Sequence, residues 1–128
     1  MFGRGQARTF KTATTQGTAG AATTLTLIAA ADQFHRIKAI TAAYTLGAAN
    51  SKGQLTVSFG APSGGVLAKV WEASHIRADD SGAYFTGSSH FQFGDSGIQE
   101  EAMTFNRRCE ITLSAVALAI GTVSVVYE

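Results

Sequence analysis

The stretch Cys109-Glu110-Ile111-Thr112-Leu113-Ser114-Ala115 alternates apolar and polar residues without interruption. Alternation with a period of two places one set of side chains on each face of an extended chain, so it predicts a half-buried β-strand. The stretch Gly121-Thr122-Val123-Ser124-Val125-Val126-Tyr127 repeats the pattern through Val123, Val125 and Tyr127. The two stretches together predict two β-strands in the last fifth of the chain.

The same alternation recurs through most of the 128 residues. Its apolar members are Leu25 and Leu27, then Leu55, Val57 and Phe59, then Phe91 and Phe93, and finally Met103 and Phe105. Residues 34–46 also predict a strand, although their pattern leaves open which face is buried. Residues 66–73 fit a strand or one short helix, and the strand is favoured because Val66, Val70 and Trp71 suit a pleated surface.

Glycine-rich and polar segments separate these strands at residues 47–53, 60–65, 79–82, 94–97 and 106–108. Short strands at such spacing, with no long amphipathic helix, are typical of an antiparallel β-sandwich or barrel. We expect an all-β fold, a two-sheet jelly roll in the first instance. The length fits one domain, which we place at residues 23–128, preceded by an extended N-terminal arm over residues 1–22.

The expected arm contains much Gly, Ala, Thr and Gln, with Phe2 and Phe10 as its only large apolar side chains. It buries too little apolar area to offset the entropy of ordering it alone. A neighbouring chain would order it most simply, although pairing with its own sheet would also serve. Arg4, Arg8 and Lys11 give residues 1–31 a charge of +3, whereas seven bases and nine acids give residues 32–128 a charge of −2.

The composition excludes several classes of protein. Charged residues make up 15% of the chain, below the roughly 25% of typical soluble domains, so much of the surface must be Ala, Thr, Ser and Gly. Three arm bases form a weak site for a polyanion, and we expect no direct nucleic-acid contact. No apolar run is long enough to span a bilayer, so no membrane segment is expected. One cysteine excludes a disulfide framework and a cysteine-based metal site, and no cofactor is predicted.

Residues of catalytic type do not form a recognisable site. The three histidines, His35, His75 and His90, lack the pairwise spacing that brings two imidazoles to one metal ion. No metal site is therefore predicted. The acids Asp79-Asp80 and Glu100-Glu101 are more simply solvated turn residues than a glycosidase pair. Asp79, Asp80 and Asp95 lack the ligand spacing of a calcium loop. Cys109 lies within a strand, where a buried thiol is inert. We therefore expect a protein that is not an enzyme.

Aromatic side chains suggest one alternative if they are exposed. Trp71 and Tyr84 could form a platform for sugar rings, as in a lectin-like carbohydrate-binding module. The simpler interpretation places the neighbouring aromatic residues, Phe91 and Phe93 among them, in the core.

The strand-like segments Gly53-Gln54-Leu55-Thr56-Val57-Ser58-Phe59-Gly60, Cys109–Ala115 and Gly121–Tyr127 resemble the small jelly-roll accessory proteins of tailed-bacteriophage virions. The resemblance covers the chain from about residue 53 onward. It implies a virion protein, assembled in the host cytoplasm, that decorates or cements a capsid or serves as an adaptor or fibre anchor, often as a homotrimer or other homo-oligomer. The arm residues Phe2, Arg4, Arg8, Phe10 and Lys11 would then bind the major capsid protein or neighbouring virion subunits. The carbohydrate-binding alternative would belong to an adaptor or fibre.

Overall fold

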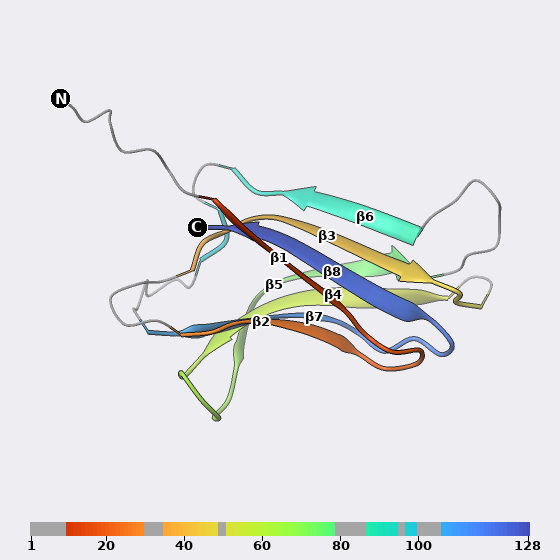
Figure 1. Ribbon diagram of the computed structural model, residues 1–128, viewed down its shortest axis with the longest axis horizontal. Coiled ribbons are helices and arrows are strands. Elements are labelled where there is room, and N and C mark those ends of the chain that lie inside the picture. The colour runs from red at the N-terminus through yellow and green to blue at the C-terminus, as the bar shows by residue number, and fades with distance from the viewer. Residues whose placement is uncertain (1–9, 30–34, 49–50, 79–86, 95–96, 100–105) are drawn as a thin grey trace.

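The protein consists of two antiparallel β-sheets that pack face to face (Figure 1). The computed structural model describes residues 10–29, 35–48, 51–78, 87–94, 97–99 and 106–128. The strands are β1 (Lys11–Gln16), β2 (Thr23–Leu27), β3 (Ile37–Thr45), β4 (Lys52–Gly60), β5 (Ala68–Arg77), β6 (Gly87–Gln92), β7 (Arg108–Leu113) and β8 (Ile120–Tyr127). Among the described residues, no helix is long and apolar enough to cross a membrane. The predicted antiparallel β-sandwich is confirmed.

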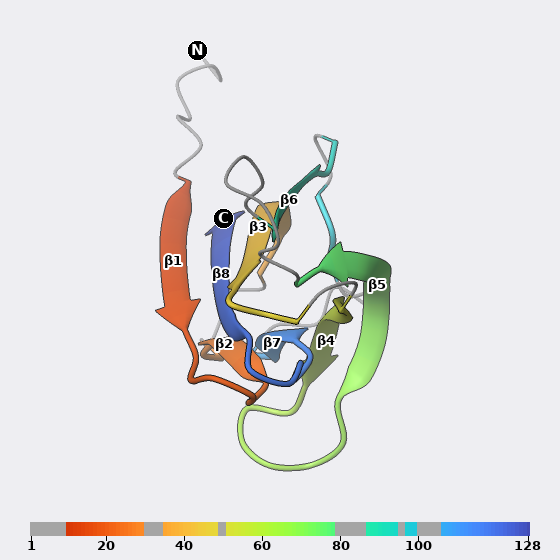
Figure 2. The same ribbon diagram turned by 90° about the vertical axis from the view of Figure 1, so that its right-hand side faces the viewer.

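The order of the strands is that of a jelly roll. Sheet A has the order β1-β8-β3-β6, and sheet B has the order β2-β7-β4-β5. β1 pairs with β8, β2 with β7, β3 with β6 and β4 with β5, so the chain folds as one long antiparallel ribbon whose successive strand pairs alternate between the sheets. The view along the sandwich in Figure 2 shows β1 and β5 on opposite sides of the molecule.

The core lies between the two sheets and follows the alternation of the sequence. Leu55, Val57, Ile111 and Leu113 are fully buried in sheet B, whereas Thr112 between the last two is only partly buried. Sheet A contributes the following buried side chains: Ile37, Ile40, Ala42, Tyr44, Val123 and Val125. The apolar positions predicted from the pattern at 25–27, 55–59, 109–113 and 123–125 therefore form the core, and Met103 and Phe105 lie outside the described residues.

Two segments that the pattern left ambiguous are resolved. Within residues 34–46, β3 buries Ile37 and Ile40, and a register shift between Ile37 and Ala39 makes Lys38 an extra residue that breaks the period of two. Residues 66–73 contribute to a strand, as favoured, but β5 begins at Ala68, and Val66 before it is exposed.

The expected N-terminal arm is shorter than residues 1–22. Lys11–Gln16 form strand β1, which pairs with β8 over its whole length, and a turn over residues 17–22 leads into β2. Backbone pairing with its own sheet orders this segment although it has few apolar side chains. The sandwich therefore begins at β1, and residues 1–9 of the expected arm lie outside the described part of the chain.

A bulge in β5 places His75 in a left-handed backbone conformation. Gly53 pairs with Ile76 and Leu55 with Ala73, so Ser74 and His75 both lie opposite Gln54. His75 has a φ of 66°, a conformation that glycine adopts without the steric cost of a Cβ atom.

We expect His75→Gly to raise the free energy of unfolding by about 1 kcal/mol, because the exposed imidazole loses no packing and the strain is relieved. Urea unfolding would measure the change. Ser74→Gly is the matched control in the same bulge. It should lower stability, because Ser74 has no positive φ and glycine adds only conformational freedom to the unfolded chain. Equal effects of the two substitutions would contradict the interpretation of the bulge.

Candidate interaction surface

Most of the outer face of sheet A carries no Asp, Glu, Lys or Arg at its described positions. The described charges lie at one end of the sheet, where Lys38 occupies the β3 bulge and Arg36 Nη1 lies 3.2 Å from Glu128 Oε1. The register of β1, β8, β3 and β6 aligns the outward side chains across the sheet. Apart from Lys38, the described outward side chains are Thr12, Thr14, Gln16, Ala39, Thr41, Ala43, Thr45, His90, Gln92, Ile120, Thr122, Ser124 and Val126. We call this set the neutral face.

Hydrogen bonds between neighbouring strands hold the short polar side chains of the neutral face. Thr14 Oγ1 lies 2.8 Å from Ser124 Oγ, and Thr41 Oγ1 lies 2.7 Å from His90 Nδ1. The first contact joins two hydroxyls, and the second joins a hydroxyl to an imidazole nitrogen. Because short side chains project little from a sheet, the neutral face offers a surface on which another polypeptide can lie without desolvating a charge.

The outer face of sheet B differs because it carries paired charges. Lys69 Nζ lies 2.8 Å from Glu72 Oε2, and Arg108 Nε donates to Glu110 Oε2 at 2.8 Å. Gln54 Nε2 also donates to Glu72 at 2.7 Å. Ion pairs therefore lie on the strands of sheet B, where they favour contact with water, whereas the neutral face itself contains no ion pair.

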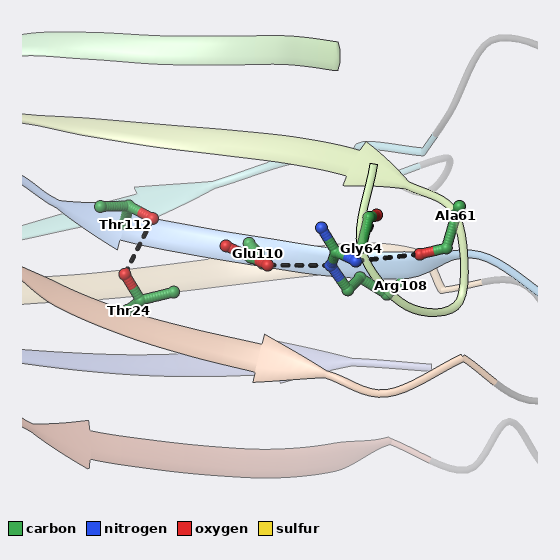
Figure 3. A network of polar contacts seen from close by, with 6 residues as sticks. All are labelled: Thr24, Ala61, Gly64, Arg108, Glu110 and Thr112. Atoms are coloured by element: carbon green, nitrogen blue, oxygen red, sulfur yellow. Dashed lines mark hydrogen bonds and ion pairs between the residues drawn. The ribbon is translucent and has the colours of Figure 1, made fainter. Parts of the chain in front are cut away.

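Arg108 also holds the loop between β4 and β5 (Figure 3). Its Nη1 donates to the carbonyl oxygens of Ala61 at 3.2 Å and Gly64 at 2.9 Å. On the same face, the hydroxyls of Thr24 and Thr112 lie 3.2 Å apart between β2 and β7. The polar side chains of this face satisfy one another and the adjacent backbone, which is a structural role.

A groove of about 390 Å³ opens between the sheets where β1 and β2 form the side of the sandwich. Its lining residues are Lys11, Ala13, Thr26, Leu27, Ile28, His35 and Tyr127. His35 Nε2 is hydrogen bonded to the carbonyl oxygen of Ile28 at 2.7 Å, and its ring packs edge-on against Tyr127 with centroids 5.7 Å apart. Lys11 Nζ lies 6.0 Å from the Tyr127 ring centroid. The groove combines an apolar floor with one cation.

One of the predicted arm residues, Lys11, lines this groove, and Phe10 precedes Lys11 in the sequence. Phe10 is 52% exposed, and Lys11 lies at the start of β1. Phe2, Arg4 and Arg8 lie outside the described residues. The described part of the predicted binding segment therefore adjoins the neutral face and the groove.

Trp71 belongs to an aromatic cluster on the opposite side of the sandwich. Its ring makes edge-to-face contacts with Phe91 and Phe93, both at a centroid distance of 5.1 Å. All three side chains are partly buried against the core. This packing favours the core interpretation of Trp71 over a flat sugar platform, and Tyr84, the other platform residue, lies outside the described residues.

Among the described residues, the titratable side chains of catalytic type lie in different parts of the fold. His35 lies at the groove, His75 on the β5 bulge and His90 on the neutral face. Among the described residues, no three His, Cys, Asp or Glu side chains could share a metal ion. Asp79, Asp80, Asp95, Glu100 and Glu101 lie outside the described residues.

Cys109 is completely buried in β7. Burial, with a smaller contribution from the charge of Glu110, raises the pKa of its thiol to about 12. Because the thiolate is the reactive form, this cysteine is a poor nucleophile and fills the core as a small apolar side chain.

Two exposed leucines adopt backbone conformations that the sequence did not indicate. Leu46 and Leu118 have φ angles of 67° and 68° and are 62% and 67% exposed. Thr45 and Ile120 are register partners, so both leucines lie at the same end of sheet A. Leu118 occupies the third position of a turn closed by Ala119 N donating to Val116 O at 3.0 Å, where glycine is the usual residue.

Comparison with known proteins adds no further constraint. No protein-family model matches the chain, and no curated protein is significantly similar to it.

Proposed function

We propose that the protein is a non-enzymatic structural component of a virus particle, acting as a capsid decoration or cement protein. The neutral face carries this proposal. A face composed mainly of Thr, Ser, Ala and Gln in a chain with few charges is suited to burial against a neighbouring subunit, because its own side chains include no Asp, Glu, Lys or Arg to desolvate. Lys38 and the Arg36–Glu128 pair lie at one end of the sheet.

The basic N-terminal segment supports the same proposal. Arg4 and Arg8 precede β1 directly in the sequence, and Lys11 begins that strand. Bases on a segment next to a neutral face would steer it toward an acidic capsid surface, and an extended segment can bind by adding a strand. The partners in this proposal are the major capsid protein or neighbouring virion subunits, with self-association into a homotrimer or another homo-oligomer.

The fold determines how this proposal is tested. Removal of residues 1–22 would delete strand β1, whereas removal of residues 1–9 leaves every strand of the sandwich intact. We expect the shortened protein to bind purified capsids of its virus at least about tenfold more weakly, because Arg4 and Arg8 are lost. Co-sedimentation with capsids would measure the affinity.

Substitutions control for charge alone. The pair Arg4→Gln and Arg8→Gln should weaken capsid binding and its dependence on salt, whereas Lys52→Gln, at an exposed position of β4, should change neither. The proposed role of the N-terminal segment is overturned if the protein without residues 1–9 binds capsids as the full chain does. The proposed function fails if the full chain does not bind them.

A further inference from the structure

The open sides of the sandwich differ in how their edge strands are protected. On one side, β5 carries Lys69 and Glu72, and register shifts at two positions interrupt its pairing with β4. Charges and bulges of this kind prevent an edge strand from pairing with another chain. On this side the Trp71 cluster also bridges the two sheets. The β5 side is therefore a protected edge.

Strand β1, on the other side, has no such protection. It pairs with β8 through six consecutive residues with no register shift. It contains no proline, and its only charged residue, Lys11, is the first. Sheet A ends at β1, so no described strand pairs with its outer edge.

The backbone groups that β1 presents outward can be assigned. Gly17 N donates to Gly121 O at 2.8 Å, next to the register pair Gln16 and Thr122. Hydrogen-bonded pairs in an antiparallel ladder recur every second residue, so Lys11, Ala13 and Thr15 bond to β8. The N–H and C=O groups of Thr12, Thr14 and Gln16 therefore point away from the sheet.

We propose that β1 pairs with β1 of a second copy of this chain, antiparallel and about a twofold axis at Thr14. Thr14 would then face Thr14 of the second copy, and Thr12 would face its Gln16. Each of these pairs exchanges two N–H···O bonds, which makes about six bonds in total. Sheet A would continue across the dimer, and the two neutral faces would form one surface.

Charge favours a second copy in this orientation. Lys11 would lie opposite Gly17 of the other chain, so the two ammonium groups are six residues apart along the ladder, about 20 Å. At physiological salt this exceeds the screening length of about 8 Å, and the two charges do not repel. A parallel arrangement would place the two Lys11 side chains next to each other, which disfavours it.

The area of the contact predicts a weak dimer. The edge is about 20 Å long for six residues, and two sheets about 10 Å apart with their side chains make it about 20 Å deep. This corresponds to about 800 Å² over both copies, below the roughly 1,200 Å² of stable complexes. Phe10, half exposed, would lie against the Gly17–Thr18 turn of the second copy and add apolar area. We therefore expect association at micromolar rather than nanomolar concentrations.

Sedimentation equilibrium of the purified full chain, from about 10 to 500 µM, tests the dimer. Thr14→Pro removes an outward N–H and leaves the β8 ladder intact, so it should abolish association while circular dichroism is unchanged. Thr14→Lys, which tests the same contact if the proline variant does not fold, places two ammonium groups at the twofold axis. It should weaken the dimer at least about tenfold, and high salt should relieve this effect. Thr14→Val, which loses only the hydroxyl bonded to Ser124, should still dimerise.

Cross-linking tests the register. Hydrogen-bonded antiparallel residues lie about 5.5 Å apart between Cα atoms, within disulfide range. Oxidation of Thr14→Cys should therefore give a disulfide-linked dimer, whereas Gln92→Cys, exposed on the opposite edge strand β6 of the same sheet, should not. The native Cys109 is buried and does not interfere.

Four results would overturn the proposal: a chain that stays monomeric to about 500 µM, a trimer, a Thr14→Lys variant that dimerises like the native chain, or equal cross-linking of the two cysteine variants. The inference rests on the self-association in the proposed function. Because no capsid is present, its failure is distinguishable from a failure of capsid binding.

Discussion

Gly53→Ala is expected to lower the free energy of unfolding by about 3 kcal/mol, because a side chain at this position meets the ring of Tyr44. A Cβ atom built on Gly53 lies 2.6 Å from Tyr44 Cζ and 2.8 Å from Cε2, and it also overlaps the hydroxyl oxygen. The ring has little room to move, since Tyr44 is 2% exposed and its hydroxyl donates to Ser114 O at 2.6 Å.

Urea unfolding would measure this loss, with Gly94→Ala as the matched control. No atom lies within 4 Å of a Cβ built on Gly94, and its φ is not in the left-handed region, so this variant should change stability by less than about 0.5 kcal/mol. Tyr44→Phe removes the overlapping oxygen, so Gly53→Ala should cost less in that background than in the native chain. Equal stability of Gly53→Ala and the native chain would contradict the packing of β4 against Tyr44.

The alternation of apolar residues was sufficient to predict the strands with large side chains. Val57, Ile111 and Val123 are buried because a period of two commits one face of each strand to the core. Strand β3 was ambiguous because Lys38 is an extra residue at a bulge, and a bulge inverts the inward and outward positions on either side of it.

Strand β1 could not be predicted from its side chains. Ala13 and Thr15 face inward but bury little apolar area, so the segment lacks the signal that marks β2 or β7. Strand β1 is held in place by backbone hydrogen bonds to β8, which lies more than a hundred residues away along the chain. Long-range pairing of this kind is also why the sequence could favour a jelly roll but could not exclude another sandwich.

The candidate surface could be predicted only in part from the sequence. The low charge of the chain indicated that some face would be neutral, and Thr12 and Thr14 lie in a segment already expected to contact partners. That Thr14, Ser124 and Thr41 share a face depends on which strands are neighbours, and the sequence pattern contains no such information. The left-handed conformations of Leu46 and Leu118 were also hidden, because no glycine or asparagine indicated them.

Ile111→Ala is expected to lower the free energy of unfolding by about 3 to 4 kcal/mol, because it removes buried methyl groups at the centre of the sandwich. Ile111 is fully buried in β7, between Leu25 of β2 and Val57 of β4 in the register of sheet B. Neighbouring strands on both sides hold the backbone in place, so the cavity cannot close by a movement of an edge.

Thr112→Ala is the control in the same strand, and it should change stability by less than about 1 kcal/mol because Thr112 points outward and loses only an exposed hydroxyl contact with Thr24. The difference between these adjacent positions, measured by urea unfolding, tests the assignment of the two faces of β7. A register shifted by one residue would reverse the order of the two effects, because every side chain of the strand would change faces. Since β7 pairs with both β2 and β4, such a reversal would also contradict the strand alignment on which the charged outer face of sheet B depends.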